Sequence, residues 1–432
     1  MITVLAFLFV LGVLIFVHEL GHFLVARFYG VRVLTFSLGF GPKLLKIRRG
    51  ATEYCISAIP LGGYVKLAGE TVQDQRSGEP DEFLSKSKWV RVQVYLAGPV
   101  MNLGLALVVV AIVLSLGADV PLYQSSTPVI GTVAAGSAGE AAGLKVGDRV
   151  LTVDGKKVET WDALAIEYLP RANRELEFGV QRDGQIIQVH VTPRATGKYE
   201  IGDLGIGPIL RPQFAQVNVG GPAERAGIRR GDVVVALEGQ RGVARDAIVD
   251  KWRSSAEKPV RMTLERDGEE RDVTIVPELD GGIGMVRVLL TYFEMKRVDP
   301  TLPQALKLSA RQNWDNTVLI GKTLVGLITR DTPVRQLMGP IAIAELSGSA
   351  AELGLVELLN LMAMISLNLG LLNLLPVPVL DGGQIAILAW EGLIRRDLSN
   401  RAKERILLAG AALIVLLMVT VIYNDISRLI RY

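Results

Sequence analysis

The sequence predicts a polytopic α-helical membrane protein with about four transmembrane helices and two α+β domains inserted between the second and third helices. Half of the 432 residues are hydrophobic and the mean hydropathy is +0.34. Yet 21% of the residues are charged, more than a bundle of membrane helices alone would hold. A long polar region that repeats itself lies between the second and third apolar stretches. The net charge of only +3 gives no sign of nucleic acid as a partner.

Four regions contain apolar stretches long enough to cross a bilayer. The first, second and fourth transmembrane helices are expected within residues 1–28, 90–116 and 405–423. The third region, residues 354–392, is apolar on both sides of an interruption at residues 376–383, which holds two prolines, an aspartate and two glycines. A broken segment is tolerated at membrane depth only where it lines a cavity or is buried in protein. The third region is therefore expected to line a cavity or to be buried in protein.

The lysines and arginines predict how the helices cross the membrane. They are frequent between the first and second helices and between the third and fourth, whereas none precedes the first helix. Since basic connections stay on the cytoplasmic side, both termini and the long region 117–355 are expected outside. Residues 29–89 then form a cytoplasmic region beside the membrane. Three strand candidates in it, residues 33–38, 43–47 and 53–59, predict a β-hairpin region.

The first apolar stretch contains the motif His18-Glu19-Leu20-Gly21-His22. Histidines four residues apart share one face of a helix, so both imidazoles can bind one Zn²⁺ while Glu19 activates water as a general base. The same pattern occurs by chance on the surfaces of soluble helices. Here the chain has only three histidines, and polar groups at membrane depth are costly unless they have a role. The third, His190, lies in an alternating strand pattern and is interpreted as an ordinary strand residue.

Two histidines leave a catalytic zinc ion one protein ligand short. The single Cys55 leaves no cysteine pair for a thiolate site, so the third ligand is expected to be a carboxylate. Asp381 lies inside the broken third region and is followed by two glycines, which allow close approach to another helix. The alternative is that Asp381 only caps a helix. Glu391 is the weaker candidate, because it stands near Arg395 and Arg396 at the expected interface.

The long outer region contains a tandem repeat. Residues 142–148 recur as 226–232 and Arg182-Asp183-Gly184 recurs as 266–268, both at an offset of 84. Each copy reads as a short strand, a small-residue helix, a turn, a strand, a helix and a closing hairpin. We therefore expect two domains, over residues 125–203 and 204–285. Both resemble PDZ domains of the bacterial, protease-associated kind.

The PDZ resemblance implies a peptide-binding role. PDZ domains add an extended peptide to a sheet edge and often capture its terminal carboxylate in backbone N–H groups. The candidate peptide loop of the second domain is Leu204-Gly205-Ile206, whereas no equally clear loop precedes the first domain. The alternative is that both domains only add bulk at the mouth of the site. Residues 300–353, which follow, are expected to form amphipathic linker helices that either brace these domains or gate access.

The motifs taken together resemble the site-2 protease family of intramembrane zinc metalloproteases, in its bacterial regulator-of-sigma-E protease type with tandem PDZ domains. The resemblance rests on His18-Glu19-x-x-His22, on Asn373-x-x-Pro376-x-Pro378-x-Leu380-Asp381-Gly382, and on the repeat between the second and third helices. Supporting segments are residues 39–42, 60–66, 97–102 and 338–341. It covers nearly the whole chain.

The resemblance implies roles for individual residues. His18, His22 and Asp381 would hold one Zn²⁺ per chain, and Glu19 would be the catalytic base. Asn373, Pro376 and Pro378 would hold the substrate near the metal, with Gly62 and Gly63 in a membrane-associated hairpin that presents its edge to an extended substrate. The alternative for this region is an ordinary cytoplasmic hairpin.

The resemblance also implies a reaction and its setting. The chain would be an endopeptidase of the bacterial cytoplasmic (inner) membrane, with its active site toward the cytoplasm and its PDZ domains extracytoplasmic. Its substrates would be single-span regulators such as anti-sigma factors, first cut outside by a site-1 type protease, and possible further substrates are signal-peptide remnants. The main alternative is a non-catalytic PDZ scaffold with a structural metal site. A metal transporter is disfavoured, because the second and fourth helices offer few polar residues, such as Asn102, Ser115 and Thr420.

Overall fold

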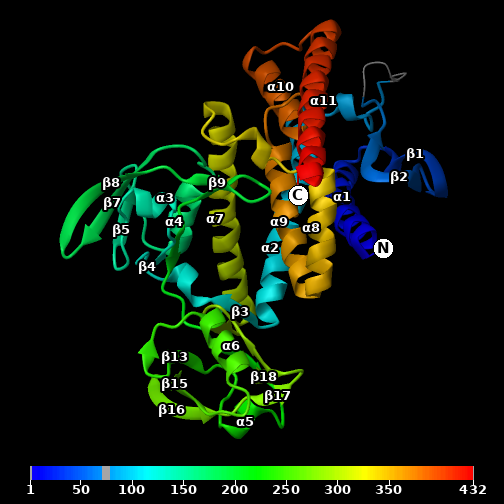
Figure 1. Cartoon of the computed structure of the whole chain (residues 1–432). Coiled ribbons are helices and arrows are strands. Elements are labelled where there is room, and N and C mark those ends of the chain that lie inside the picture. The colour runs from blue at the N-terminus through cyan, green and yellow to red at the C-terminus, as the bar shows by residue number, and fades with distance from the viewer. Residues whose placement is uncertain (1, 71–77, 432) are drawn as a thin grey trace. The chain divides into compact units, whose positions relative to one another are not determined.

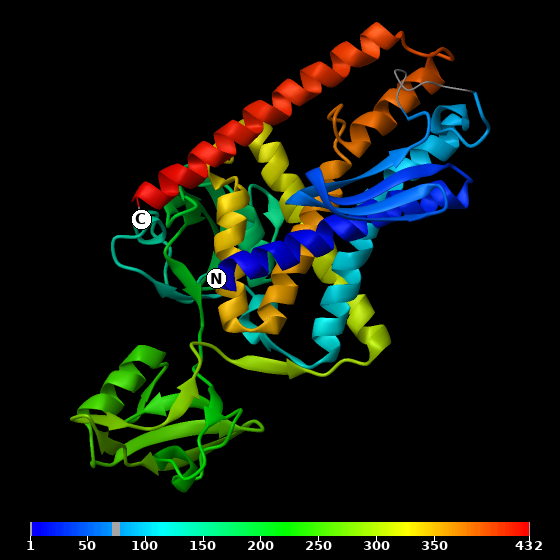
Figure 2. The same ribbon diagram turned by 90° about the vertical axis from the view of Figure 1, so that its right-hand side faces the viewer.

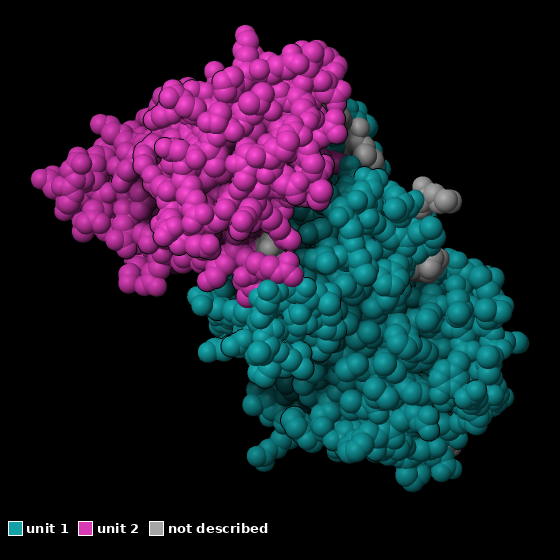
Figure 3. Space-filling model, turned by 90° about the horizontal axis from the view of Figure 1, so that it is seen from below, with its two compact units in different colours: residues 1–117, 299–324, 334–432 teal, residues 118–298, 325–333 magenta. Residues whose placement is uncertain are grey.

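The computed structural model describes residues 2–70 and 78–431 (Figure 1). The chain divides into two compact units, which Figure 3 shows in different colours. The helical unit comprises residues 1–117, 299–324 and 334–432, and the β-rich unit comprises residues 118–298 and 325–333.

Among the described residues, four helices of the helical unit are long and apolar enough to cross a membrane. They are α1 (Ile2–Phe28), α2 (Lys88–Ser115), α9 (Leu355–Asn373) and α11 (Asn400–Arg431). Apolar side chains such as Leu5 and Leu416 stay largely exposed, as expected of surfaces that face lipid rather than water. Together with the β-rich unit, these helices make the chain a polytopic membrane protein, as its sequence predicts.

Small residues bring α1, α2 and α9 close together. A side chain at Gly21 of α1 would collide with the backbone of Ala97 in α2, and one at Gly370 of α9 would lie 3.0 Å from the Pro99 carbonyl oxygen. The Ser366 hydroxyl of α9 donates to the backbone carbonyl of Asn102 at 2.8 Å. Close backbone contact of this kind is typical of helices packed within a bilayer, where apolar burial alone does not drive association.

The interrupted third region consists of two helices joined by an irregular segment. After α9 the chain runs through residues 374–380 and enters α10 (Asp381–Leu393). Side chains at Gly382 and Gly383 would collide with the backbone carbonyls of Leu374 and Val377. The two glycines therefore let the start of α10 fold back against this segment.

Two long strands replace the three short ones that the sequence predicts. β1 (Val33–Arg49) and β2 (Thr52–Leu67) pair along their lengths, and residues 33–38 pair with residues 63–67. Gly39 and Gly41 have φ values of 90° and 82°, conformations that glycine adopts without strain, and the register shifts at this point. The sheet therefore bends, and its base packs on α1 and α2 through a cluster that includes Phe23, Phe36 and Phe83.

Polar contacts fix both ends of α11, the red helix of Figure 2. Near its start, Lys403 donates to the fully buried Glu391 of α10 at 2.7 Å. Near its end, Asp425 accepts the backbone N–H groups of Gly339, Ile341 and Ala342, at the start of α8 (Pro340–Leu353). Glu391 thus pairs with a lysine and has a structural role. This agrees with the sequence analysis, in which it is the weaker candidate for the third ligand.

α7 (Leu302–Thr329) begins in the helical unit and ends in the β-rich unit. Its fully buried Ser309 donates to the backbone carbonyl of Leu107 in α2 at 2.7 Å. Trp314, on the same helix, is largely exposed. The first turns of α7 are thus attached to the helical unit.

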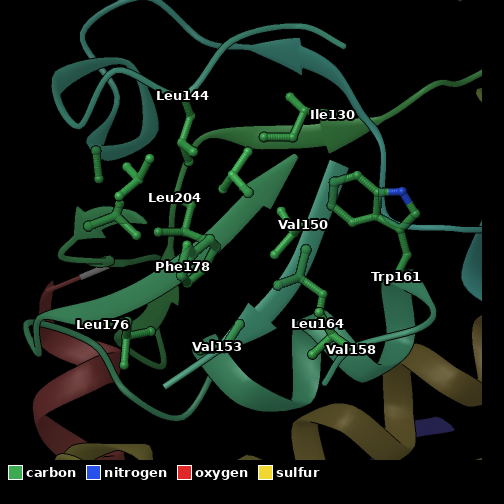
Figure 4. Packing of buried hydrophobic residues seen from close by; sticks show 14 residues of the cluster. Ile130, Leu144, Val150, Val153, Val158, Trp161, Leu164, Leu176, Phe178 and Leu204 are labelled. Carbon is green, nitrogen blue, oxygen red and sulfur yellow. The ribbon is translucent and has the colours of Figure 1, made fainter. Parts of the chain in front are cut away.

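The β-rich unit contains two four-stranded antiparallel sheets with the same strand order, β6-β5-β7-β8 and β14-β13-β15-β16. The first is built from β5 (Arg149–Val153), β6 (Lys156–Lys157), β7 (Leu176–Arg182) and β8 (Gln185–Val191), with α4 (Trp161–Tyr168). The second is built from β13 (Val233–Leu237), β14 (Gln240–Arg241), β15 (Val260–Arg266) and β16 (Glu269–Ile275), with α6 (Arg245–Ser254). Each sheet has its own core. Figure 4 shows the first, around Phe178 and Leu164.

The β-rich unit also contains short strands and helices outside the two four-stranded sheets. They are β3 (Ala118–Pro121), β4 (Ile130–Val133), α3 (Ala138–Ala141), β9 (Arg194–Thr196), β10 (Ile201–Asp203), β11 (Ile206–Pro208), β12 (Phe214–Val217), α5 (Pro222–Arg225), β17 (Glu278–Asp280), β18 (Ile283–Met285), β19 (Val288–Leu290) and β20 (Met295–Val298). Short 3₁₀ helices cover Phe83–Ser85, Leu122–Ser125 and Val334–Gln336.

The segment Leu204-Gly205-Ile206 does not belong to the second domain, as the sequence predicts, but to the first copy. It was expected to open the second domain, but Leu204 is 1% exposed within the core of the first sheet, and β11 pairs with β4 of the first copy. In the second copy β19 pairs with β12, and the residues before it are Val286, which is buried in the second core, and Arg287. Arg287 has φ 56° where Gly205 has φ 64°. The loop therefore belongs to the first copy, and each copy has one.

Candidate metal centre

Three predicted ligands from distant parts of the helical unit lie together. His18 and His22 come from α1, and Asp381 is the first residue of α10. The His18 Nε2 atom lies 3.2 Å from Asp381 Oδ2 and 3.2 Å from His22 Nε2, and His22 Nε2 lies 3.6 Å from Asp381 Oδ1. Among the described residues, this is the one group of three or more His, Cys, Asp or Glu side chains whose ligand atoms gather within 4.8 Å.

The spacing of these atoms fits a zinc ion. Tetrahedral zinc with ligand bonds of about 2.0–2.1 Å sets its ligand atoms roughly 3.3 Å apart. The three measured separations of 3.2, 3.2 and 3.6 Å lie close to this value. Two histidines and one carboxylate also form a donor set typical of catalytic zinc, which leaves one position open. The side chains are 11–16% exposed, so the cluster is largely buried but still accessible.

Helix α2 orients the two imidazoles. His22 Nδ1 lies 2.8 Å from the Val94 carbonyl oxygen, and His18 Nδ1 lies 3.2 Å from the side-chain nitrogen of Asn102. Between them, a side chain at Gly98 would come within 2.4 Å of His22 Nε2 and 2.8 Å of His18 Cε1. Val94, Gly98 and Asn102 are spaced four residues apart, so they share one face of α2.

Val94 and Gly98 were not among the site residues inferred from sequence. A backbone carbonyl leaves no residue-type signal, so Val94 could not be found by motif. Gly98 and Asn102 lie in the segment 97–102, which the sequence offers only as support for a family resemblance. Their four-residue spacing from Val94, matched to the four-residue spacing of the histidines, is the signal that could have found them.

Glu19 lies beside the three candidate ligands and against β2. It directly follows His18 on α1. A side chain at Gly63 of β2 would lie 3.1 Å from Glu19 Cγ and 2.8 Å from the Ser37 carbonyl oxygen. The structure thus brings Gly63 to the candidate base. Gly62 precedes it in β2 and has a φ of 147°, a conformation that favours glycine.

The other predicted substrate residues lie in and before the segment that leads to Asp381. Asn373 ends α9, and Pro376 and Pro378 stand in residues 374–380. The Pro378 carbonyl accepts a hydrogen bond from Gln384 Nε2 at 2.7 Å, which holds this segment to the start of α10. The cap position of α10 is Leu380 and not Asp381, so the capping alternative for Asp381 does not apply.

The arrangement is the one expected of a class of protein, the membrane metalloproteases, in which two histidines and one carboxylate can hold a catalytic zinc ion. The sequence matches the family model described as Peptidase family M50 over residues 6–417. It is 34% identical to Protease RseP of Yersinia pestis and 35% identical to Regulator of sigma-E protease RseP of Escherichia coli (strain K12), in each case over 98% of both chains. Regulator of sigma-E protease RseP of Salmonella typhimurium (strain 14028s / SGSC 2262) is 34% identical over 98% of both chains.

The chain belongs to peptidase family M50, the site-2 protease family. The predicted recognition, the zinc metalloprotease activity and the Zn²⁺ cofactor are thereby confirmed.

Proposed function

We propose that His18, His22 and Asp381 bind one Zn²⁺, that Glu19 is the general base, and that the chain cleaves the transmembrane segments of membrane-anchored proteins. The observation that carries the proposal is the meeting of three ligand atoms at 3.2–3.6 Å, on α1, which is long and apolar enough to cross a membrane, and at the start of α10. Polar groups are seldom held within a membrane span without a function.

The chemistry assigns one task to each side chain. Zn²⁺, when bound, polarises the scissile carbonyl and makes water acidic enough to be deprotonated near neutral pH. Glu19 takes the proton from the attacking water and delivers it to the leaving amide nitrogen. The Val94 carbonyl accepts from His22 Nδ1, which keeps the Nε2 lone pair of that ring directed toward the cluster.

The surroundings of the site suit an extended substrate. A transmembrane helix hides its amide groups, so it must unwind before it is cut. Residues 63–67 of β2 pair with β1 along one edge and pass Glu19, and a strand edge can accept a substrate backbone. In the segment that leads to Asp381, Pro376 and Pro378 keep the backbone non-helical. Asn373, at the end of α9, would bind the backbone groups of the unwound substrate. Leu44, Leu45 and Ile47 are exposed apolar residues of β1 that would enter the bilayer.

The two copies in the β-rich unit are proposed to be PDZ-like domains. Their shared strand order and their loops at Gly205 and Arg287 support this assignment. With the basic connections inside, both copies would be extracytoplasmic, with the metal site toward the cytoplasm. They would read the tail of a substrate or exclude bulky ones. The bilayer would be that of the bacterial inner membrane.

The substrate class follows from the relatives. Because several of them are named regulators of sigma-E, we propose that the chain acts on single-span regulators of the anti-sigma-factor kind. A site-1 type protease would first shorten such a substrate outside the membrane. Signal-peptide remnants are a second candidate class.

A Glu19→Gln variant tests the proposal. The full chain is reconstituted in vesicles with a single-span substrate, and bound zinc and cleavage are measured together. We expect one zinc per chain and cleavage at least about 10²-fold slower than wild type, the contribution typical of general acid–base catalysis. The matched control is Glu357→Gln, at an exposed position of α9, which leaves cleavage unchanged. Cleavage at the wild-type rate by the zinc-loaded Glu19→Gln variant would exclude Glu19 as the general base.

A further inference from the structure

The side chain of Asn102 is fully buried between α1, α2 and α9. Its nitrogen Nδ2 lies 3.2 Å from His18 Nδ1. Its oxygen Oδ1 is buried and has no hydrogen-bond partner among the described residues. An amide oxygen without a donor is costly in an apolar interior, so this atom calls for an explanation.

The requirements of a zinc ligand supply one. A histidine that binds metal through Nε2 carries its proton on Nδ1, and that N–H needs an acceptor. His18 Nε2 is the nitrogen that faces His22 and Asp381, so Nδ1 is the protonated nitrogen in the zinc-bound state. An Asn nitrogen cannot accept from it, because the amide NH₂ group is a donor only.

Exchanging the two ends of the amide resolves this conflict. The oxygen and nitrogen of an Asn side chain have nearly the same shape, and a half-turn of the terminal torsion swaps them. After the swap the oxygen occupies the position 3.2 Å from His18 Nδ1, where it accepts the N–H. The oxygen then has the donor that it lacks.

We propose that Asn102 is a positioning residue for His18: its side-chain oxygen accepts the Nδ1–H and keeps Nε2 directed at the metal. The inference rests on the proposed role of His18 as a zinc ligand. Val94 does the same for His22 with its backbone carbonyl at 2.8 Å. The two acceptors stand on one face of α2, on either side of Gly98, whose missing side chain makes room for both rings. One helix thus orients both histidines.

The test uses the full chain labelled with ¹⁵N-histidine in lipid nanodiscs, since only three histidines contribute signals. The variants are Asn102→Leu, which removes the acceptor, and Asn102→Asp, which retains it. Ser366→Ala is the matched control, because it breaks the bond to the Asn102 backbone and leaves the amide side chain unchanged. Zinc affinity is measured by competition with a chelator, and the ring signals report the protonated nitrogen.

In wild type, zinc is expected to leave Nδ1 protonated in both His18 and His22. Asn102→Leu should shift the His18 Nδ1 signal and weaken zinc binding by about 10- to 100-fold, while Asn102→Asp and Ser366→Ala keep the affinity. An unchanged affinity and signal in Asn102→Leu overturns the proposal. Should that variant not fold, a tenfold or larger loss in Asn102→Asp overturns it instead. If zinc moves no His18 signal in wild type, the ligand assignment itself fails, and this inference fails with it.

Discussion

His18 Nε2 lies 3.2 Å from Asp381 Oδ2, although the two residues stand near opposite ends of the chain. The contact joins α1, the first helix, to the start of α10. A metal ion shared by them couples the packing of these two helices to its own binding, since ligand binding to the folded state stabilises it. Several measurable consequences follow from this site.

Removal of the proposed third ligand should release the metal. In Asp381→Ala the two imidazoles remain but the carboxylate is gone, so zinc binding is expected to weaken by at least about 10- to 100-fold and cleavage to stop. Metal analysis of the purified full chain measures the zinc content. Asp315→Asn, at an exposed position of α7, is the control and should keep one zinc per chain. Full zinc occupancy in Asp381→Ala would exclude Asp381 as a ligand.

A methyl group at Gly98 should disturb both histidines at once. In Gly98→Ala the new Cβ would stand 2.4 Å from His22 Nε2 and 2.8 Å from His18 Cε1, so the rings must move. We expect zinc affinity to fall about tenfold or more, the size of effect that loss of ligand orientation produces. The matched control is Gly104→Ala on the same helix, where nothing lies within 4 Å of the added carbon. If both variants bind zinc equally, the rings are not confined by Gly98.

A side chain at Gly63 should impair cleavage without loss of metal. In Gly63→Ala the new Cβ would lie 2.8 Å from Ile15 Cγ2 and 3.1 Å from Glu19 Cγ, and none of its three nearest atoms belongs to a proposed ligand. Because small displacements of a catalytic group are costly, cleavage is expected to slow by about 10²-fold. Zinc content and cleavage rate are measured on one preparation. Loss of zinc together with activity would show that β2 supports the metal site rather than the base.

The first sheet should carry a stabilising ion pair that acid removes. Burial alone would raise the pKa of Asp148, but hydrogen bonds from Arg182 and from the backbone N–H of Lys145 outweigh it and hold the pKa below its usual range. A lowered carboxyl pKa stabilises the fold above the unfolded value, about 3.9, and this stabilisation disappears as the pH falls through the folded value. Asp148→Asn should therefore cost about 1–3 kcal/mol at pH 7 and progressively less in acid.

Hydrogen exchange measures this pair within one molecule. The second sheet has a matching pair, Arg266 with Asp232 at 2.6 Å, which the substitution leaves intact. Loss of protection in β5 and β7 of the Asp148→Asn variant, with β13 and β15 unchanged, is the expected result. Equal protection of both sheets at pH 7 would mean that the Asp148–Arg182 pair adds nothing to stability.

The parts of the site that depend on residue type could be predicted from sequence. His18, His22 and Asp381 have side chains whose chemistry is rare at membrane depth, and the proline and glycine pairs around Asp381 marked the break between α9 and α10. Backbone contributions could not be found in this way. The Val94 carbonyl that orients His22 is present in every residue, and only the fold brings it within 2.8 Å.

Long-range strand pairing explains where the fold predicted from sequence was wrong. Leu204 precedes the second repeat in sequence, but β11 pairs with β4, and that non-local pairing returns the loop to the first core. The three predicted strands of the hairpin region merge into β1 and β2, because Gly39 and Gly41 bend a strand that a local pattern reads as ending. Strand ends and pairing partners are decided by tertiary contacts that a local pattern does not contain.

The position of the cleaved bond tests whether the chain cuts transmembrane segments with Glu19 as the general base. The zinc-loaded full chain is reconstituted in vesicles with a single-span substrate, and the new termini are mapped by mass spectrometry in wild type and in Glu19→Gln. We expect a cut within or next to the apolar span in wild type and no such product in the zinc-loaded variant. A cut confined to the soluble part of the substrate, or the same product from Glu19→Gln at the wild-type rate, would contradict it.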